Sequence, residues 1–368
     1  MNTRREFLEN AAGALVGIAF VGCGLMTAAP ARAQMRRREV VVSGRRVKVV
    51  DVHAHCAVPE AMALMGLKLG APGTSLPPLL HVATQASDRI RAMDEQGIDV
   101  EALSINPYWY KTDRDLASHL IKIQNEKLAA ACAANPDRFV AFASVALQHP
   151  DLAAQQLEEG VKKYGLRGAG IGGSVNGEEL SDPKFHPFWA KAEQLGVLVF
   201  IHPQGAGVAA EIPGRLKGNG LLENVIGNPL ETTIALSHLI FEGTLDRFPG
   251  LKICAAHGGG YLPSYAGRSD QGCLTFPDRC PGTKDGPLKK KPTEYLKQLY
   301  YDNIMFTPEA MRHLVAEVGS SQLVVGTDFP YPWTKTAVDL VLDTPGLSDA
   351  ERVAMLGGTA AKLLGINA

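Results

Sequence analysis

The sequence predicts a single α/β domain with the (β/α)8 architecture of a TIM barrel. From about residue 47 onward, apolar runs of strand length alternate with longer segments of helical character, a pattern typical of parallel strands joined by helices. Four of the apolar runs end in a histidine or an aspartate. The carboxyl ends of barrel strands surround one mouth, so these residues should converge there. Residues 34–368 contain no linker-like stretch that would divide them into two domains.

The first barrel strand is expected to end in two histidines. Ser43-Gly44 separates the runs 39–42 and 47–52, as in a hairpin that leads into the strand. The second run continues to His53 and His55. Side chains at positions i and i+2 of a strand point the same way, so the two imidazoles could bind one ion together.

The remaining elements follow in alternation. Strands are expected at 98–105, 139–146, 168–171, 197–202, 251–257, 300–305 and 323–328, and helices at 87–96, 115–134, 151–164, 187–195, 231–242 and 308–318. Irregular insertions are expected after strands 1, 5 and 6, at residues 57–82, 203–228 and 267–292. The first insertion leaves the histidine end of its strand, so it should help to form the pocket.

Further residues of metal-binding type stand at the ends of later strands. His202, His257 and Asp328 end the fifth, sixth and eighth strands. One such residue alone is more often a hydrogen-bonding or helix-capping residue, but their coincidence with the two histidines of strand one favours a metal site. The fourth strand ends in Gly172-Gly173-Ser174 and lacks the bridging lysine of two-metal barrel hydrolases, which favours one ion.

Two features allow two interpretations each. The aromatic cluster Tyr108-Trp109-Tyr110 follows the second strand, where Trp109 either packs over an unsaturated or aromatic substrate or belongs to the core. Cys273 and Cys280 share one loop and form either a disulfide or two separate thiols.

Residues 1–33 have the form of a twin-arginine export signal. Arg4-Arg5 precedes an apolar stretch that is too short to span a membrane comfortably, and Ala31-Arg32-Ala33 resembles a cleavage site. We expect cleavage after Ala33 and a periplasmic protein; an uncleaved anchor and lipid attachment at Cys23 are the alternatives. The nearly balanced charge, 37 basic against 38 acidic residues, does not indicate nucleic-acid binding.

Five motifs together resemble one known family. They are His53-x-His55, His202-Pro203, Glu231-Thr232-Thr233, His257-Gly258-Gly259-Gly260 followed by Arg268, and Gly326-Thr327-Asp328-Phe329-Pro330. In this order they resemble the aminocarboxymuconate-semialdehyde decarboxylase group of the amidohydrolase superfamily. Most members of that group are metal-dependent, non-oxidative decarboxylases of unsaturated or aromatic acids, and a minority are hydrolases or hydratases.

The resemblance assigns roles to individual residues. It implies that His53, His55, His202 and Asp328 bind one divalent ion, most simply zinc, with manganese as an alternative. His257 would be the base that takes a proton from a water molecule on the ion. If the protein is instead a hydrolase, Asp328 or His257 would pass a proton to the leaving group. Arg268 would reach across the interface of a homodimer to bind a substrate carboxylate; a surface ion pair is the alternative.

Two departures from the family pattern predict a different substrate. Residues 56–88 lack the arginine that the namesake decarboxylase carries after strand one, and Asn224 stands where it has a tryptophan. His81 lies in that loop and is a candidate substrate contact. The sequence therefore predicts a carboxy-lyase acting on an unsaturated or aromatic carboxylic acid. The alternatives are a metal-dependent hydrolase of a lactone, ester or amide, or a binding protein that keeps the barrel without turnover.

Overall fold

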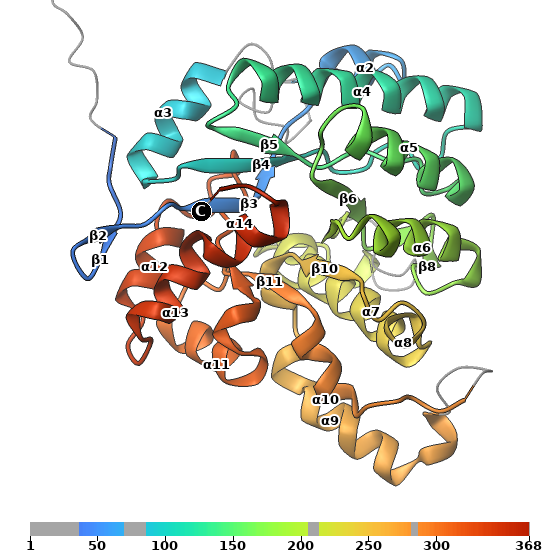
Figure 1. Ribbon diagram of the computed structural model, residues 1–368. Helices are drawn as coiled ribbons and strands as arrows, with labels where there is room; N and C mark the ends of the chain where they lie inside the picture. Colours follow the sequence, from blue (N-terminus) through green and yellow to red (C-terminus); the bar gives the residue numbers. More distant parts are fainter. Residues whose placement is uncertain (1–36, 70–85, 205–212, 281–285, 368) are drawn as a thin grey trace, which may run out of the picture. The chain divides into compact units, whose positions relative to one another are not determined.

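The computed structural model describes residues 37–69, 86–204, 213–280 and 286–367 (Figure 1). Arg37–Ala368 form one compact unit. The predicted export signal, Cys23 and His81 lie outside the described residues.

Within the described residues, eight parallel strands form the barrel. Hydrogen bonds order them as β3-β4-β5 and as β12-β11-β10-β9-β6. Isolated parallel bridges join Asp51 to Val325 and Ala143 to Ala169, so that both gaps between the two sheets are closed. The predicted TIM barrel is confirmed. Its strands are β3 (Val50–His55), β4 (Val100–Ser104), β5 (Phe139–Ala141), β6 (Gly168–Gly172), β9 (Leu198–His202), β10 (Lys252–Ala255), β11 (Tyr300–Asp302) and β12 (Leu323–Val324).

Helices surround the strands, and two short hairpins are added to them (Figure 1). The hairpins are β1 (Val41–Val42) with β2 (Arg45–Arg46), and β7 (Ser174–Val175) with β8 (Glu178–Glu179). The α-helices are α2 (Pro59–Ala63), α3 (Ala86–Gln96), α4 (Arg114–Ala134), α5 (Pro150–Lys162), α6 (His186–Leu195), α7 (Asn228–Phe241), α8 (Thr244–Arg247), α9 (Leu262–Thr275), α10 (Pro292–Tyr295), α11 (Pro308–Val318), α12 (Ala337–Asp343), α13 (Asp349–Val353) and α14 (Thr359–Leu364).

Short 3-10 or π-helical turns complete the described chain. They are η2 (Pro183–Phe185), η3 (Pro213–Arg215), η4 (Glu223–Gly227), η5 (His257–Gly259), η6 (Pro277–Arg279), η7 (Leu296–Gln298), η8 (Ser320–Gln322) and η9 (Ala354–Gly358). Each predicted insertion contains residues outside the described part of the chain, so their extents stay predictions. The third insertion, residues 267–292, was expected to be irregular. Its first part is instead helical, because α9 continues as a regular helix as far as Thr275.

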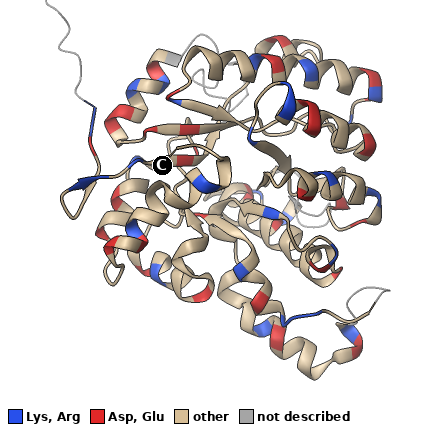
Figure 2. Cartoon of the chain, viewed as in Figure 1, with Lys and Arg blue, Asp and Glu red and all other residues tan. Residues whose placement is uncertain are grey.

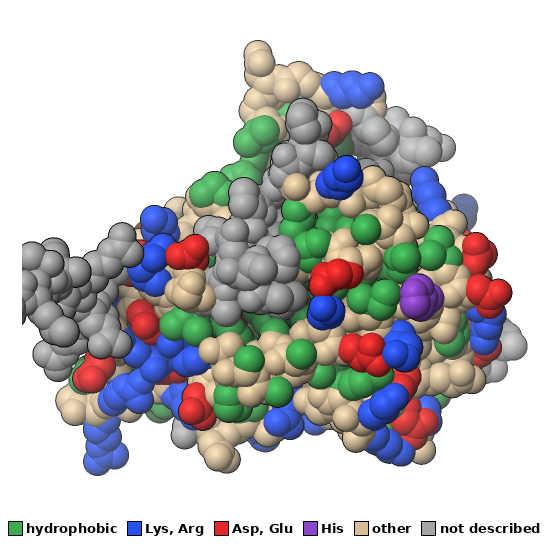
Figure 3. Space-filling model, turned by 90° about the horizontal axis from the view of Figure 1, so that it is seen from above, with side chains coloured by type: hydrophobic (Ala, Val, Ile, Leu, Met, Phe, Trp, Pro, Cys, Tyr) green, Lys and Arg blue, Asp and Glu red, His purple; other side chains and the backbone are tan. Residues whose placement is uncertain are grey.

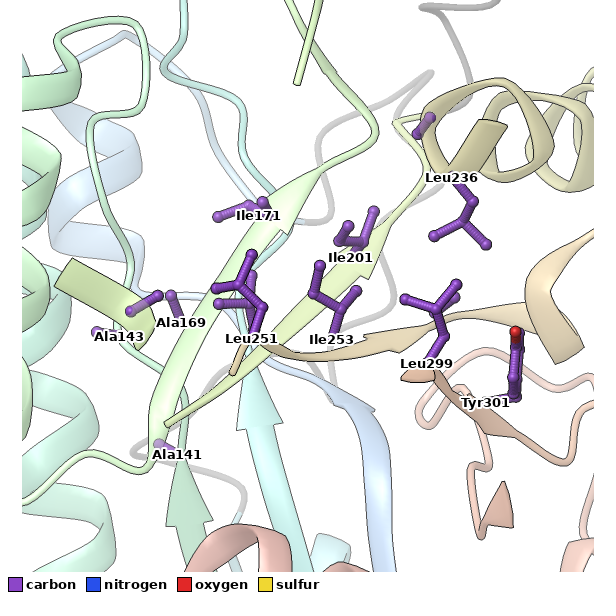
Figure 4. Packing of buried hydrophobic residues seen from close by; sticks show 14 of the residues in the cluster. Ala141, Ala143, Ala169, Ile171, Ile201, Leu236, Leu251, Ile253, Leu299 and Tyr301 are labelled. Atoms are coloured by element: carbon purple, nitrogen blue, oxygen red, sulfur yellow. The ribbon is translucent and has the colours of Figure 1, made fainter. Parts of the chain in front are cut away.

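The barrel has an inner and an outer apolar layer, because strand side chains alternate. Leu198 and Phe200 of β9 belong to the inner cluster, which α14 also contacts. Val199 and Ile201 belong to the outer cluster between strands and helices. Figure 4 shows this outer layer, where Ile201 and Ile253 of neighbouring strands lie near Leu236 of α7.

A β-bulge interrupts the alternation in β3. Val50 pairs with Val100 and His55 pairs with Ser104, so β3 contains one more residue than β4 between these pairs. Val50 and Val52 face the inner cluster, and regular alternation would turn His53 and His55 to the opposite face. The extra residue reverses the phase, which brings both histidines to the barrel mouth.

Charged side chains lie mainly on the helices and loops (Figure 2). On the face shown in Figure 3, positive and negative groups are interspersed among apolar ones. No helix of the described chain has the length and apolar character needed to cross a membrane.

The structure selects one interpretation of the cysteine pair. Cys273, near the end of α9, forms a disulfide with Cys280. In the described part of the chain, Cys56, Cys132 and Cys254 are free thiols.

Candidate metal centre

The structure brings five of the predicted site residues together at the carboxyl ends of the strands. Ligand atoms of His53, His202, His257 and Asp328 all lie within 4.8 Å of one another. His55 joins them, because its Nε2 lies 2.8 Å from Asp328 Oδ1 and 2.9 Å from His53 Nε2. This group of histidines and one aspartate could hold a metal ion.

Several polar atoms of this cluster are buried without a hydrogen-bond partner in the described part of the chain. Within the described residues, both ring nitrogens of His202 and Asp328 Oδ1 are buried and lack a well-aligned hydrogen bond. Buried polar groups without partners are costly, and imidazoles with one carboxylate suit zinc or manganese. The residues therefore fit a divalent ion.

Three of the four predicted ligands have shifted pKa values that leave them in the protonation state that binds metal. Burial lowers the pKa of His55 to about 4 and also lowers that of His202 well below its ordinary value. Burial opposes the ionised form of Asp328, but the neighbouring His53, His257 and His55 together outweigh burial and the carboxyl pKa falls. Both imidazoles are thus neutral and the carboxyl is ionised near pH 7.

His53 differs from the other histidines because two carboxylates flank it. Its Nδ1 donates to Asp302 Oδ2 at 2.6 Å, and its Nε2 lies 3.2 Å from Asp328 Oδ1. Burial disfavours the imidazolium, yet Asp328 and Asp302 together raise the pKa of His53 to about 10. In the absence of metal this histidine carries a second proton, which lies among the predicted ligands.

Asp51 joins the first strand to the segment that carries Asp328. Its Oδ2 accepts from Thr327 Oγ1 at 2.6 Å, and its Oδ1 accepts from the backbone N–H of His53 at 2.9 Å. Burial and the charge of Glu101 raise the pKa of Asp51 to about 8. Asp328 itself adopts φ 61°, so these bonds hold an unfavourable backbone conformation in place.

A buried ion pair supports the same strand ends from outside the barrel. Arg89 of α3 donates to Glu101 Oε2 at 2.9 Å and also to the carbonyl of His55. Its guanidinium lies 4.8 Å from the centre of the Phe329 ring, next to Asp328. Arg89 therefore contacts the backbone of one predicted ligand and the neighbour of another.

Trp109 lies in the hydrophobic core of the described chain. The ring is fully buried, and its Nε1–H donates to the carbonyl of Val145 at 2.9 Å. The burial and this hydrogen bond support the core interpretation, and a substrate contact by Trp109 stays a prediction. The ring packs edge-on against both Tyr108 and Tyr110.

Arg268 lies on the surface, whereas Glu231 of the Glu-Thr-Thr motif is buried. Arg268 is exposed on α9 and makes no ion pair with a described residue of its own chain. Glu231 is buried, and its Oε2 accepts from the backbone N–H of Gln204 at 3.0 Å. The carboxylate thereby holds the chain just after His202.

Sequence reasoning missed Asp302, Asp51 and the Arg89–Glu101 pair. Asp302 ends β11 as Asp328 follows β12, so the rule that found the ligands could also have found it. Asp51 and Glu101 lie inside apolar strands, where buried acids are rare unless they have partners. An acidic residue inside an apolar strand was therefore the sequence signal that could have pointed to Asp51 and Glu101.

The sequence model of the amidohydrolase family matches residues 50–366. This chain belongs to that family. Among the relatives of this amidohydrolase, 2-amino-3-carboxymuconate-6-semialdehyde decarboxylase of Dictyostelium discoideum is 32% identical over 286 residues, which are 76% of each protein. The gamma-resorcylate decarboxylase of Rhodococcus jostii is 28% identical, and the match covers 86% of this amidohydrolase and 97% of the relative.

A solved structure agrees with the fold of this amidohydrolase. The dihydroxybenzoic acid decarboxylase of a Polaromonas species, with bound manganese and the inhibitor 2-nitroresorcinol, superimposes with a TM-score of 0.73 at 26% identity. The match covers 87% of this amidohydrolase and 97% of that chain. The family inferred from the sequence motifs is confirmed.

Proposed function

We propose that the protein is a metal-dependent, non-oxidative decarboxylase of an unsaturated or aromatic carboxylic acid. The observation that carries this proposal is the convergence of His53, His55, His202, His257 and Asp328 in one cluster at the barrel mouth. The relatives that match over most of this chain are carboxy-lyases.

The proposed metal ligands are His53, His55, His202 and Asp328. Zinc is the ion that their chemistry suits most simply. Manganese is supported by the Polaromonas decarboxylase, which contains it. A divalent ion held by these residues would supply positive charge to stabilise the electron pair left on carbon when carbon dioxide departs.

His257 is proposed to hold and move the proton of the reaction. Loss of carbon dioxide from a carboxylate leaves an electron pair on carbon, which must take up one proton. The His257 side chain is 14% exposed, so it faces the mouth, and its Nε2 lies 4.0 Å from Asp328 Oδ2. An imidazole beside a carboxylate can accept a proton and return it to the substrate.

The direct test is carbon dioxide release from purified protein offered aromatic and muconate-type acids beside a panel of lactones. We expect release that stops with chelator and returns with zinc or manganese. Chelator-sensitive lactone opening without carbon dioxide would instead assign a hydrolase. Metal binding with neither reaction would favour a binding protein.

The homodimer is proposed from the surface of α9. Arg268 and Tyr265 lie one turn apart on this helix, and Tyr265 is 66% exposed. In the proposed dimer, Arg268 binds the substrate carboxylate in the site of the partner subunit.

Mixing two inactive variants tests this arrangement. In a twofold dimer, random mixing of Arg268→Ala and His257→Ala subunits leaves about a quarter of all sites intact, so about a quarter of the wild-type activity should return. A matched mixture of His257→Ala and Asp328→Ala should regain nothing, because both residues act in one subunit. No recovery by the first mixture, or a fully active monomer, would refute the cross-subunit role.

Export and the role of His81 are also proposals. The disulfide between Cys273 and Cys280 supports an oxidising compartment such as the periplasm. Mass spectrometry of the exported protein should find a chain that begins after Ala33, and a chain that retains residues 1–33 would contradict cleavage. If His81 contacts substrate, His81→Ala should raise KM on the true substrate; unchanged kinetics would exclude it.

A further inference from the structure

Asp302 is a fully buried carboxylate that lies behind the proposed metal ligands. Its Oδ2 accepts from His53 Nδ1 at 2.6 Å and from the backbone N–H of His257 at 2.9 Å. Its Oδ1 accepts from the backbone N–H of Gly258 at 3.0 Å and of Ile304 at 3.1 Å. One side chain therefore contacts both a proposed ligand and the chain segment that carries the proposed base.

The bond to His53 determines which ring nitrogen can bind metal. An ionised carboxylate only accepts hydrogen bonds, so His53 Nδ1 must carry the hydrogen between the two groups. In the neutral imidazole the lone pair is then on Nε2. That atom lies 2.9 Å from His55 Nε2 and 3.2 Å from Asp328 Oδ1. Asp302 thereby directs the free nitrogen of His53 toward the other ligands.

The bonds to His257 and Gly258 stabilise an unusual turn. His257 has φ 55° and Gly258 has φ 61°, and this left-handed conformation is uncommon for residues other than glycine, although histidine tolerates it better than most. Successive backbone N–H groups in such a turn point toward one anion. Asp302 is that anion here, so it fixes the position from which the His257 ring enters the mouth.

Close packing leaves Asp302 little freedom to move. A Cβ atom at Gly326 would lie 2.8 Å from Asp302 Cβ and 2.9 Å from His53 Cβ, so the absence of a side chain at Gly326 permits the approach. Gly326 N–H also donates to Asn303 Oδ1 at 2.9 Å. The Asp302 carboxylate is therefore held between His53 at the end of β3 and the His257 turn that follows β10.

We propose that Asp302 is a positioning residue that sets the tautomer of His53 and the conformation of the His257 turn together. The inference rests on the metal site of the proposed function. It adds that the ligand and the base are placed by the same carboxylate, so that a change at Asp302 should affect both.

The test is Asp302→Asn, measured first by manganese affinity in a chelator competition without any substrate. The amide that replaces Oδ2 would donate to His53 Nδ1 and move the ring hydrogen to Nε2, against metal binding. We expect manganese affinity, corrected in each protein for the proton that His53 loses on binding, to fall about 10- to 100-fold, the usual range for loss of such a partner. At saturating metal, turnover should also stay below the wild type, because the His257 turn loses its anion.

Asn125→Ala is the matched control. This buried amide exchanges hydrogen bonds with the backbone of Ser144 and contacts none of the proposed ligands through a described hydrogen bond. It should lower thermal stability and leave manganese affinity unchanged. A folded Asp302→Asn protein that binds manganese as the wild type does would overturn the proposal.

A second measurement uses the wild-type protein, in case the variant does not fold. Nitrogen-15 NMR of histidine in the zinc-loaded protein should show His53 with hydrogen on Nδ1 and metal on Nε2. Zinc bound through Nδ1 would overturn the proposal. Both measurements are independent of substrate, so absence of decarboxylation would refute the proposed function without affecting this inference.

Discussion

The affinity of the protein for manganese should rise about tenfold for each pH unit between pH 6 and pH 8. The cause is the proton on His53, whose pKa of about 10 reflects the carboxylates of Asp328 and Asp302 on either side of the ring. With Nδ1 bonded to Asp302, the second proton lies on Nε2, the atom that faces the other ligands. A metal ion must displace this proton.

The slope follows from the other ligands. His55, with a pKa of about 4, and His202, with a lowered pKa, are already neutral at pH 6, and Asp328 is already ionised. One proton is therefore released per ion. Below the pKa of His53, each rise in pH removes this competitor, so the dissociation constant should fall about 100-fold from pH 6 to pH 8, or about 2.7 kcal/mol.

The assay is a chelator competition at pH 6, 7 and 8, corrected for protonation of the chelator. Calorimetry in two buffers of different ionisation enthalpy counts the released proton independently. Manganese is preferred over zinc because zinc acidifies its bound water more strongly and adds a second proton release. An affinity that does not change with pH would refute a protonated His53. A hundredfold change per pH unit would require a second protonated ligand.

Three further outcomes test the site and the core. His257→Ala should retain the metal and lower kcat by about 10²-fold or more, the scale of general acid–base catalysis; metal analysis beside steady-state kinetics decides, and full activity would refute the role. Trp109→Phe leaves the buried Val145 carbonyl without its donor, so denaturant unfolding should show a loss of about 1–3 kcal/mol with KM unchanged. A raised KM would instead support Trp109 as a substrate contact. Thiol titration of the denatured, unreduced chain from residue 34 onward should find Cys56, Cys132 and Cys254, and two more thiols after reduction; five before reduction would exclude the disulfide.

The sequence by itself determined the barrel and the residues at its mouth. Both depend on local patterns. Apolar runs alternate with helical segments, and a residue such as His202 can be placed at a strand end from the run that precedes it. Parallel barrel topology then implies convergence without any knowledge of packing. For this reason His53, His55, His257 and Asp328 could be grouped before the structure was known.

Tertiary structure alone decided how these side chains are directed. The bulge in β3 appears only in its pairing with β4, because an extra residue has no meaning until two strands are in register. Without the bulge, the regular alternation that begins at Val50 would place His53 and His55 outside the barrel. Trp109 and the cysteine pair were equally open, because exposure and sulfur proximity depend on neighbours that are distant in sequence.

Asp302 shows most clearly what the sequence alone could not predict. Its type and its place after an apolar strand are visible in the sequence. Its hydrogen bonds to His53, His257 and Gly258 exist only where strand ends meet. Sequence patterns specify which groups reach the mouth of the barrel. Hydrogen-bond direction and close packing, which act over a few ångströms between distant segments, decide which atom of each group is free to react.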